Sequence, residues 1–317
     1  ACCGLNSIGI GSGGGVGKVT AEWLMNGHIN EDLFIYDIKR FQKFHSEIKF
    51  IKERITETLG DLYGMHWPFK QHKTSRNQKL LPYHSELINA GACFGVSGGY
   101  ERPMWYSLNG KNPEYKYSYN YQNWFPSAEY ETINTRKNVG LFELTPFSKY
   151  EIKGENCHDD LQRICTANIK KVTGKCTYTQ MLNSDGGIET DLTVICLADN
   201  HFRIITAAAN RERDKFHIKK HISENTKLID VTDDFCTLGI FGPKSRDLMS
   251  DLSRDDFSNS NFKFGTGKNI TLGTLALADN SGSASNYSLS SGTFEITRKN
   301  ITFVGSRVYD GTTTVDT

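Results

Sequence analysis

The sequence has no excess of charge of either sign and no long apolar run. Its 317 residues carry 37 Lys and Arg against 36 Asp and Glu. With this balance the chain has no excess positive charge that would attract nucleic acid or an anionic membrane surface. No stretch approaches the roughly 18 apolar residues of a membrane-spanning helix, and the mean hydropathy is −0.47. We therefore expect a soluble globular protein with no nucleic-acid partner and no membrane span.

Metal-binding and disulfide patterns are also missing. All eight cysteines lie before residue 237, and none forms a CxxC or Cys/His spacing of the zinc type. The nine histidines include no HxH or HExxH arrangement. The sequence therefore predicts no metal site, and free thiols in a reducing compartment.

The start of the chain has no Met and no charged-then-apolar leader. Residue 1 is Ala, followed directly by the run CCGLN. We interpret the chain as cut from a longer one or processed, so that localisation signals are missing from it.

The spacing of apolar residues predicts that the type of secondary structure changes along the chain. A glycine-rich loop leads into a helix over residues 16–26 that stops at Gly27. Residues 50–59 have helical spacing, and residues 89–126 look like a loop-rich connector. Beyond it an α+β alternation is expected, with a hairpin turn at residues 183–187. The expected strands are 149–153, 176–183, 188–197, 201–207 and 235–242, and the expected helices are 159–167, 211–222 and 243–252.

The glycine run at residues 9–17 invites two motif assignments that fail. A Walker A loop needs Ser or Thr after Gly-Lys, but Val19 follows Lys18. The spacing GxGxxG is present, yet no strand precedes it, as a dinucleotide fingerprint requires. What remains is a set of bare amides at a helix N-terminus, which favours a phosphate or an anionic ring carbonyl. The alternative is that the glycines only permit close helix packing.

Several motifs in the first hundred residues occur in the order found in one family. They resemble the dimethylglycine/sarcosine dehydrogenases, to which the regulatory subunit of pyruvate dehydrogenase phosphatase is similar. The motifs are CGLNSIG at 3–9, GGGVGK at 13–18, DIKRF at 37–41, HWP at 66–68, GACFG at 91–95 and GYERPMW at 99–105.

This resemblance implies an FAD-dependent oxidoreductase. In the family the first segment closes the FAD domain, lies against the isoalloxazine and stabilises reduced flavin. The family's N-terminal unit, which holds the ADP half of FAD, is absent from this sequence, so we expect this polypeptide alone to be inactive. Carried over, the cofactor-binding residues are Asn6, Ser7, Ile8, Gly9, Ile10 and Gly11.

A second set of motifs resembles the folate-binding domain of the aminomethyltransferase (glycine-cleavage T-protein) family. It implies tetrahydrofolate as a second cofactor, bound near Tyr178, Asp191, Leu192 and Thr193. Tyr178 is equally compatible with stacking on a pterin and with a place in the core. The motifs are NVGLFELTPFSKY at 138–150, YTQMLN at 178–183, GGI at 186–188, DLTV at 191–194 and LGIFGPKSR at 238–246.

Asp191 is the expected catalytic residue. Strand alternation places it with Glu189 and Thr193 on the face opposite the apolar residues. In the family the matching aspartate binds the reduced folate and assists one-carbon transfer. Oxidising an N-methyl amine yields an iminium, which a folate nitrogen attacks while losing a proton. A nearby carboxylate suits this chemistry because it holds the cation and relays the proton. The alternative is an exposed strand aspartate with no role. Glu189 is either a second carboxylate of the site or, as we expect, solvated. Glu101 and Arg102 are expected to form a loop ion pair.

The last residues have a different character and look foreign to the rest. They are dense in Ser, Thr, Gly and Asn and predict a small β module over residues 266–317. The runs GKNITLG at 267–273, LALADNSGSASNY at 275–287 and VYDGTTT at 308–314 resemble bacterial haemagglutinin-like adhesin repeats of the tyrosine–aspartate–glycine (YDG) kind. We interpret this tail as a fusion, and by itself it would imply an extracellular protein.

Together these readings predict an α+β chain. Its expected domains are the end of an FAD-binding domain (1–27), an FAD oxidoreductase central or connector region (28–119), a truncated folate-binding domain (120–265) and a short all-β tail (266–317). The predicted lineage demethylates dimethylglycine or sarcosine oxidatively and passes the one-carbon unit to tetrahydrofolate, in the mitochondrial matrix or bacterial cytoplasm. The alternatives are a non-catalytic regulatory subunit and a bacterial surface repeat protein. The sequence leaves open which N-methyl amine is used and which electron acceptor takes the electrons.

Overall fold

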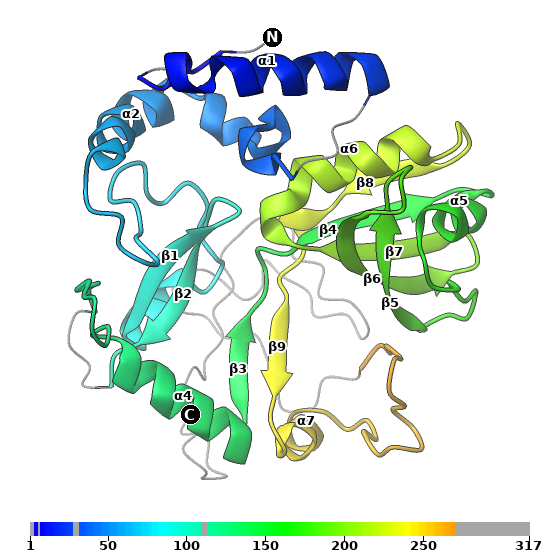
Figure 1. Ribbon diagram of the computed structural model, residues 1–317. Coiled ribbons are helices and arrows are strands. Elements are labelled where there is room, and N and C mark those ends of the chain that lie inside the picture. Colours follow the sequence, from blue (N-terminus) through cyan, green and yellow to red (C-terminus); the bar gives the residue numbers. More distant parts are fainter. Residues whose placement is uncertain (1–2, 6, 28–31, 109–112, 271–317) are drawn as a thin grey trace. The chain divides into compact units, whose positions relative to one another are not determined.

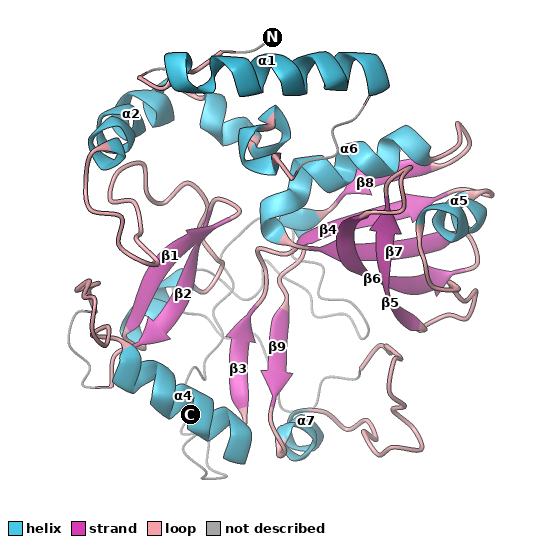
Figure 2. Cartoon of the chain, in the orientation of Figure 1, coloured by secondary structure: helices cyan, strands magenta, loops and turns pink. Residues whose placement is uncertain are grey.

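The computed structural model describes residues 3–5, 7–27, 32–108 and 113–270 (Figure 1). The predicted adhesin-like strands lie outside these residues. The chain divides into two units, residues 1–41 and 42–317, which we describe separately. Helices and strands are mixed throughout the second unit (Figure 2), as the α+β prediction requires.

The first unit is built on one helix, α1 (Gly9–Asn26). It ends where predicted, at Gly27, whose φ of +75° lies in the left-handed region that glycine adopts without steric cost. The unit continues with two short 3-10 helices, Phe34–Tyr36 and Ile38–Arg40.

The predicted start of this helix is wrong. The run of glycines is not a loop before Val16 but the first half of α1, which begins at Gly9. The backbone hydrogen bond from Ser12 N to Ile8 O, at 2.9 Å, closes the first turn. Each glycine in a helix costs about 1 kcal/mol relative to alanine, so the six glycines of α1 lower its intrinsic stability without excluding a helix.

The second unit opens with a 3-10 helix (Lys43–Ser46), α2 (Ile48–Leu62) and α3 (His84–Asn89). An antiparallel hairpin follows, made of β1 (Ala92–Ser97) and β2 (Tyr100–Tyr106). This hairpin lies inside the segment predicted to be a loop-rich connector, so that prediction is wrong there. A small apolar core supports it: Leu81, Tyr83, Leu87, Ala92 and Tyr100.

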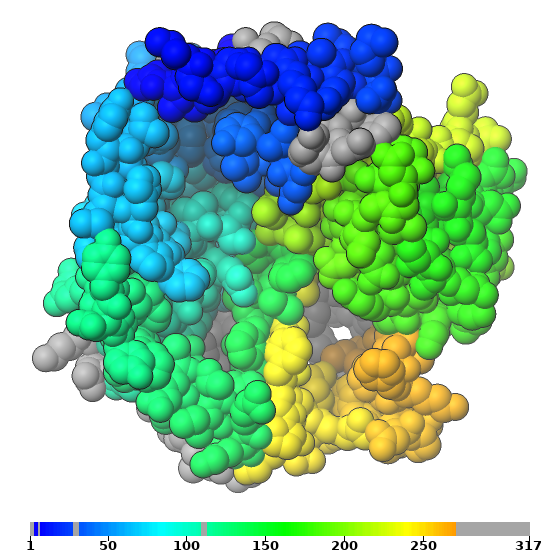
Figure 3. Space-filling view, in the orientation of Figure 1, coloured from blue at the N-terminus to red at the C-terminus, as the bar shows by residue number. Residues whose placement is uncertain are grey.

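Helix α4 (Phe125–Lys137) leads from this hairpin toward the remaining strands. Ser127 is its one buried residue, and the helix lies at the molecular surface in the space-filling view (Figure 3). After it, β3 (Gly140–Glu143) pairs antiparallel with β9 (Leu238–Phe241). Strand β9 lies within the predicted strand at 235–242 but is shorter.

The main sheet has five antiparallel strands in the order β5-β6-β7-β4-β8. The predicted hairpin is confirmed as β5 and β6, and the strands predicted at 149–153 and 201–207 are confirmed as β4 and β7. The bounds are β4 Ser148–Lys153, β5 Cys176–Leu182, β6 Ile188–Ala198, β7 His201–Thr206 and β8 Lys227–Asp230.

Two helices contact this sheet, α5 (Cys157–Ile164) and α6 (Arg211–His221), and both were predicted to within three residues at either end. Leu161 of α5 and Ile218 of α6 are fully buried with apolar side chains of the strands, which forms the main core. Two 3-10 helices (Ala208–Asn210 and Thr232–Asp234) and α7 (Ser245–Leu252) complete the described elements.

No helix in the part of the chain that the structure describes combines the length and apolar character needed to span a bilayer. The seven cysteines within the described residues are free thiols, four of them buried.

Candidate functional site

The β5–β6 hairpin fixes the position of Asp191. Its turn is held by the Asn183 side chain, whose Oδ1 accepts hydrogen bonds from Asp185 N at 3.0 Å and Gly187 N at 2.8 Å. Gly186 supplies the left-handed residue of the turn, with φ +80°. Along β6 the buried residues are Thr190, Leu192, Val194 and Cys196, so Asp191 is exposed on the opposite face, as predicted.

Tyr178 and Asp191, both predicted as site residues, lie together. The Tyr178 hydroxyl donates to Asp191 Oδ2 at 3.1 Å across the β5–β6 pair. The Tyr178 ring is 65% exposed, so this residue is not part of the core. Thr193 is paired with Tyr178 in the strand register and is half-buried on the same face. Leu192 is separate from them, because its side chain is buried in the main core behind the strand.

The same face continues across β7 and β4. Because directly paired residues of antiparallel strands point to one side of a sheet, Arg203 and Glu151 share this face with Asp191. We call it the open face. The Glu151 carboxylate accepts from Arg203 and from His201 Nε2 at 2.9 Å, and Lys153 pairs with it. Burial opposes ionisation of Glu151, but these hydrogen bonds outweigh it and lower its pKa to about 2.

The open face also carries Lys149 of β4, which is buried and lies near the buried Glu143 of β3. Lys149 Nζ donates to Thr145 O at 2.7 Å and to Phe147 O at 2.9 Å, and burial lowers the pKa of Lys149 to about 8. Burial also raises the pKa of Glu143, at the end of β3, to about 7. Shifts of this kind gather at functional sites as well as in buried polar networks.

Glu189 is partly buried rather than fully solvated. It forms an ion pair with Arg213 of α6, with Oε2 and Nη2 2.7 Å apart. The predicted loop ion pair of Glu101 and Arg102 is also wrong. Glu101 on β2 pairs with Arg76, whereas Arg102 Nε donates to Glu143 O at 3.1 Å.

The predicted flavin-contacting residues lie at the start of α1. Asn6 is outside the described residues. Ser7 has a positive φ of +65°, and Ile8 is the N-cap, with no side-chain hydrogen bond to the helix. Gly9, Ile10 and Gly11 form the first turn, which carries no acidic residue. The exposed helix N-terminus is therefore present, but at Gly9 and not after the glycines.

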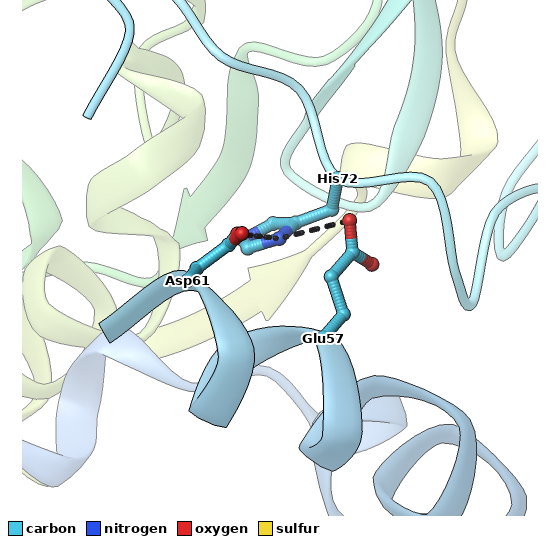
Figure 4. Close-up of side chains that lie close together, drawn as sticks. All are labelled: Glu57, Asp61 and His72. Carbon is cyan, nitrogen blue, oxygen red and sulfur yellow. Dashed lines mark ion pairs between the residues drawn. The ribbon is translucent and has the colours of Figure 1, made fainter. Parts of the chain in front are cut away.

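A further polar cluster was missed by the sequence analysis. Glu57 and Asp61 extend from one side of α2, and His72 approaches them from the segment that follows (Figure 4). His72 Nδ1 is 3.8 Å from Glu57 Oε1 and 3.8 Å from Asp61 Oδ2. The available signal was two carboxylates four residues apart, with Glu57 inside the segment of predicted helical spacing at 50–59 and Asp61 just beyond it, but the return of His72 to them is a tertiary feature.

Two family models match the chain. The one described as GCVT N-terminal domain matches residues 83–292, and the one described as FAD dependent oxidoreductase central domain matches residues 26–80. The chain thus joins an aminomethyltransferase-like domain to part of an FAD-dependent oxidoreductase. Since the first match covers more than half of its residues, the chain belongs to the GCVT N-terminal domain family. That match runs to residue 292, into the predicted tail.

Curated relatives agree with both matches. The chain is 36% identical over 270 residues to the 4-methylaminobutanoate oxidase (formaldehyde-forming) of Paenarthrobacter nicotinovorans, covering 85% of this chain and 33% of that protein. Human mitochondrial sarcosine dehydrogenase is 28% identical, and the match covers 84% of this chain and 33% of that protein. Rat mitochondrial dimethylglycine dehydrogenase is 26% identical, with 85% of this chain and 32% of that protein covered. The mouse mitochondrial pyruvate dehydrogenase phosphatase regulatory subunit is 28% identical, with 79% of this chain and 29% of that protein covered.

These relatives confirm the resemblance to the dimethylglycine/sarcosine dehydrogenases and to the regulatory subunit. Most are named as oxidases or dehydrogenases of N-methylated amino acids. The chain spans about a third of the length of the curated relatives it matches. The adhesin-like repeat stays a prediction.

Proposed function

We propose that this chain is part of an FAD-dependent enzyme that oxidatively demethylates an N-methyl amino acid, dimethylglycine or sarcosine, and passes the one-carbon unit to tetrahydrofolate. Residues 120–265 would form the folate-binding part, and residues 1–27 and 28–119 would belong to the oxidoreductase part. The observation that carries the proposal is the exposed Asp191 carboxylate, held by the Tyr178 hydroxyl on a rigid strand, in a chain of the GCVT family.

The open face suits a reduced folate. A strand in the middle of a sheet fixes its side chains better than a loop does, and β6 lies between β5 and β7. Asp191 would hold a cationic centre and relay the proton that the folate nitrogen loses. Tyr178 would orient this carboxylate through its hydrogen bond, and its exposed ring offers a surface on which a pterin could stack. Thr193 would line the same face, whereas Leu192 would act through its backbone or through packing.

FAD, when bound, supplies the oxidation of the C–N bond. The residues of this chain proposed to meet it are Ser7 to Gly11, with Asn6 beside them. Their amides fit an anionic group, because the N-cap Ile8 offers no side-chain acceptor and the first turn of α1 has no carboxylate. The cellular location we propose is the mitochondrial matrix or the bacterial cytoplasm, the compartments that the family relationship favours.

The test is calorimetric titration of the purified chain with tetrahydrofolate, wild type beside Asp191→Ala. Loss of a charge-assisted hydrogen bond is expected to cost about 1.5–3 kcal/mol of binding free energy, which is roughly 10- to 150-fold in affinity. Asp185→Ala, in the turn of the same hairpin, is the matched control and should bind like wild type. If a folded wild-type chain binds no tetrahydrofolate, the catalytic proposal fails and the regulatory-subunit alternative takes its place.

A further inference from the structure

The cluster of Glu57, Asp61 and His72 is separate from the open face and has no part in the proposed function. Residues four apart on a helix share one side of it, so Glu57 and Asp61 of α2 present their carboxylates together. Figure 4 shows the His72 ring lying over this pair. One donor atom from each residue lies within 4.8 Å of the others.

Glu57 is held in place by the segment that carries His72. Its Oε1 accepts from Lys73 N at 2.7 Å, and its Oε2 accepts from Thr74 N at 2.9 Å and from the Thr74 hydroxyl. Hydrogen bonds that orient a carboxylate in this way are a regular feature of metal sites, where they fix the ligand before the ion arrives.

His72 presents one ring nitrogen to both carboxylates. A neutral imidazole has a free lone pair on one ring nitrogen. Here the nitrogen that faces both carboxylates is Nδ1.

Two cations already lie at the edges of the cluster. Lys70 Nζ makes an ion pair with Asp61 Oδ1, on the oxygen that does not face His72, and Arg54 Nε is 3.8 Å from Glu57 Oε2. The side chain of Asp61 is 30% exposed and that of His72 45% exposed, so an ion can enter from solvent and keep water as its remaining ligand.

We propose that Glu57 Oε1, Asp61 Oδ2 and His72 Nδ1 bind one divalent transition-metal ion of the zinc type. One nitrogen and two carboxylate oxygens form a donor set that Zn²⁺ accepts, at about 2.0–2.2 Å. Ligand atoms at such lengths in a tetrahedron lie roughly 3.3 Å apart. Nδ1 of His72 lies 3.8 Å from each carboxylate oxygen, and the three donor atoms all lie within 4.8 Å of one another, so the side chains must close around the ion by between about 0.5 and 1.5 Å. The ion would cross-link α2 to residues 72–74.

The test is calorimetric titration of the chelator-treated chain with Zn²⁺. Wild type is expected to bind one equivalent at this site, and His72→Ala and Asp61→Asn are each expected to weaken binding about tenfold or more. Glu57 is left intact in these variants because it also holds the backbone of Lys73 and Thr74. His66→Ala, an exposed histidine in the same segment, is the matched control and should bind like wild type. Lys70→Met should bind at least as tightly as wild type, because it removes a competing cation.

Cobalt distinguishes this site from the cysteines of the chain. Co²⁺ bound by nitrogen and oxygen should give weak visible bands and no sulfur-to-metal charge-transfer absorption. That spectrum should be lost in His72→Ala. The proposal is overturned if wild type binds no Zn²⁺, if His72→Ala and Asp61→Asn bind it as tightly as wild type does, or if the cobalt spectrum shows thiolate ligands.

Discussion

The two faces of the five-stranded sheet use the same strands for opposite purposes. On the face covered by α5 and α6, the side chains of Tyr150, Ile152, Phe202 and Ile204 are completely buried. On the open face, Asp191 and Tyr178 are exposed, and a charged network surrounds Glu151. A single step along β6, from Leu192 to Asp191, passes from one to the other. The comparison teaches that alternation lets one rigid strand carry both the stability of the core and a reactive group.

The largest effect should come from the covered face. Leu192→Ala removes a side chain that is 2% exposed and leaves a cavity in the main core. We expect a loss of about 2–5 kcal/mol in the free energy of unfolding, measured by urea denaturation. Thr193→Ala, the next residue and on the open face, should cost much less. Equal losses in the two variants would contradict the division between the faces.

The charged network of the open face should make stability depend on pH. The folded pKa of Glu151 is about 2, whereas an unfolded glutamate titrates near 4.3, so the unfolded state binds the proton more readily. The contribution of Glu151 is therefore complete above about pH 4.3 and is lost as the pH falls toward 2. Glu151→Gln should lower the free energy of unfolding by about 1–3 kcal/mol at pH 7. It should also flatten the dependence of that free energy on pH below about pH 4.3. Urea denaturation at several pH values measures this, and parallel curves for the two proteins would refute it.

The smallest effect should come from the edge of the open face. Tyr178→Phe keeps the ring but removes the hydrogen bond to Asp191. A hydrogen bond at an exposed position contributes about 0.5–1.5 kcal/mol, so tetrahydrofolate affinity should fall severalfold and stability should stay almost unchanged. Calorimetry of Tyr178→Phe beside Tyr178→Leu separates two roles of Tyr178, orienting Asp191 and stacking on the pterin. Both variants lose the hydrogen bond, but only Tyr178→Leu also loses the ring, so it should lose more tetrahydrofolate affinity than Tyr178→Phe. Identical affinities for wild type and both variants would leave Tyr178 without a role.

Much of the sheet could be predicted from the sequence because its signals are local. The period-two pattern of β6 gave the buried positions at Thr190, Leu192, Val194 and Cys196, and the turn residues at 183–187 gave the hairpin. Asp191 was placed on the correct face for the same reason. Ile188 is the exception, since it was grouped with the apolar side but is exposed near the turn.

The errors arose where local composition and tertiary context disagree. Glycines normally indicate a loop, yet backbone hydrogen bonds close a helix from Gly9. The hairpin of β1 and β2 lies in a segment whose many Tyr, Asn, Trp and Pro residues are typical of a connector, but its register accommodates Pro103 opposite Phe94 beside an irregularity. The partner of Glu101 and the approach of His72 to Glu57 depend on residues more than ten positions away. A single sequence carries no signal for such pairs.

One measurement tests the division between the faces most directly. The free energy of unfolding of wild type, Asp191→Ala and Leu192→Ala would be measured with and without tetrahydrofolate at 100 times the wild-type dissociation constant. A ligand that binds only the folded state stabilises wild type by about 2.7 kcal/mol under these conditions. We predict that Asp191→Ala matches wild type without ligand but gains about 1.4 kcal/mol or less with it, whereas Leu192→Ala is destabilised throughout. Full stabilisation of Asp191→Ala by tetrahydrofolate would contradict the account.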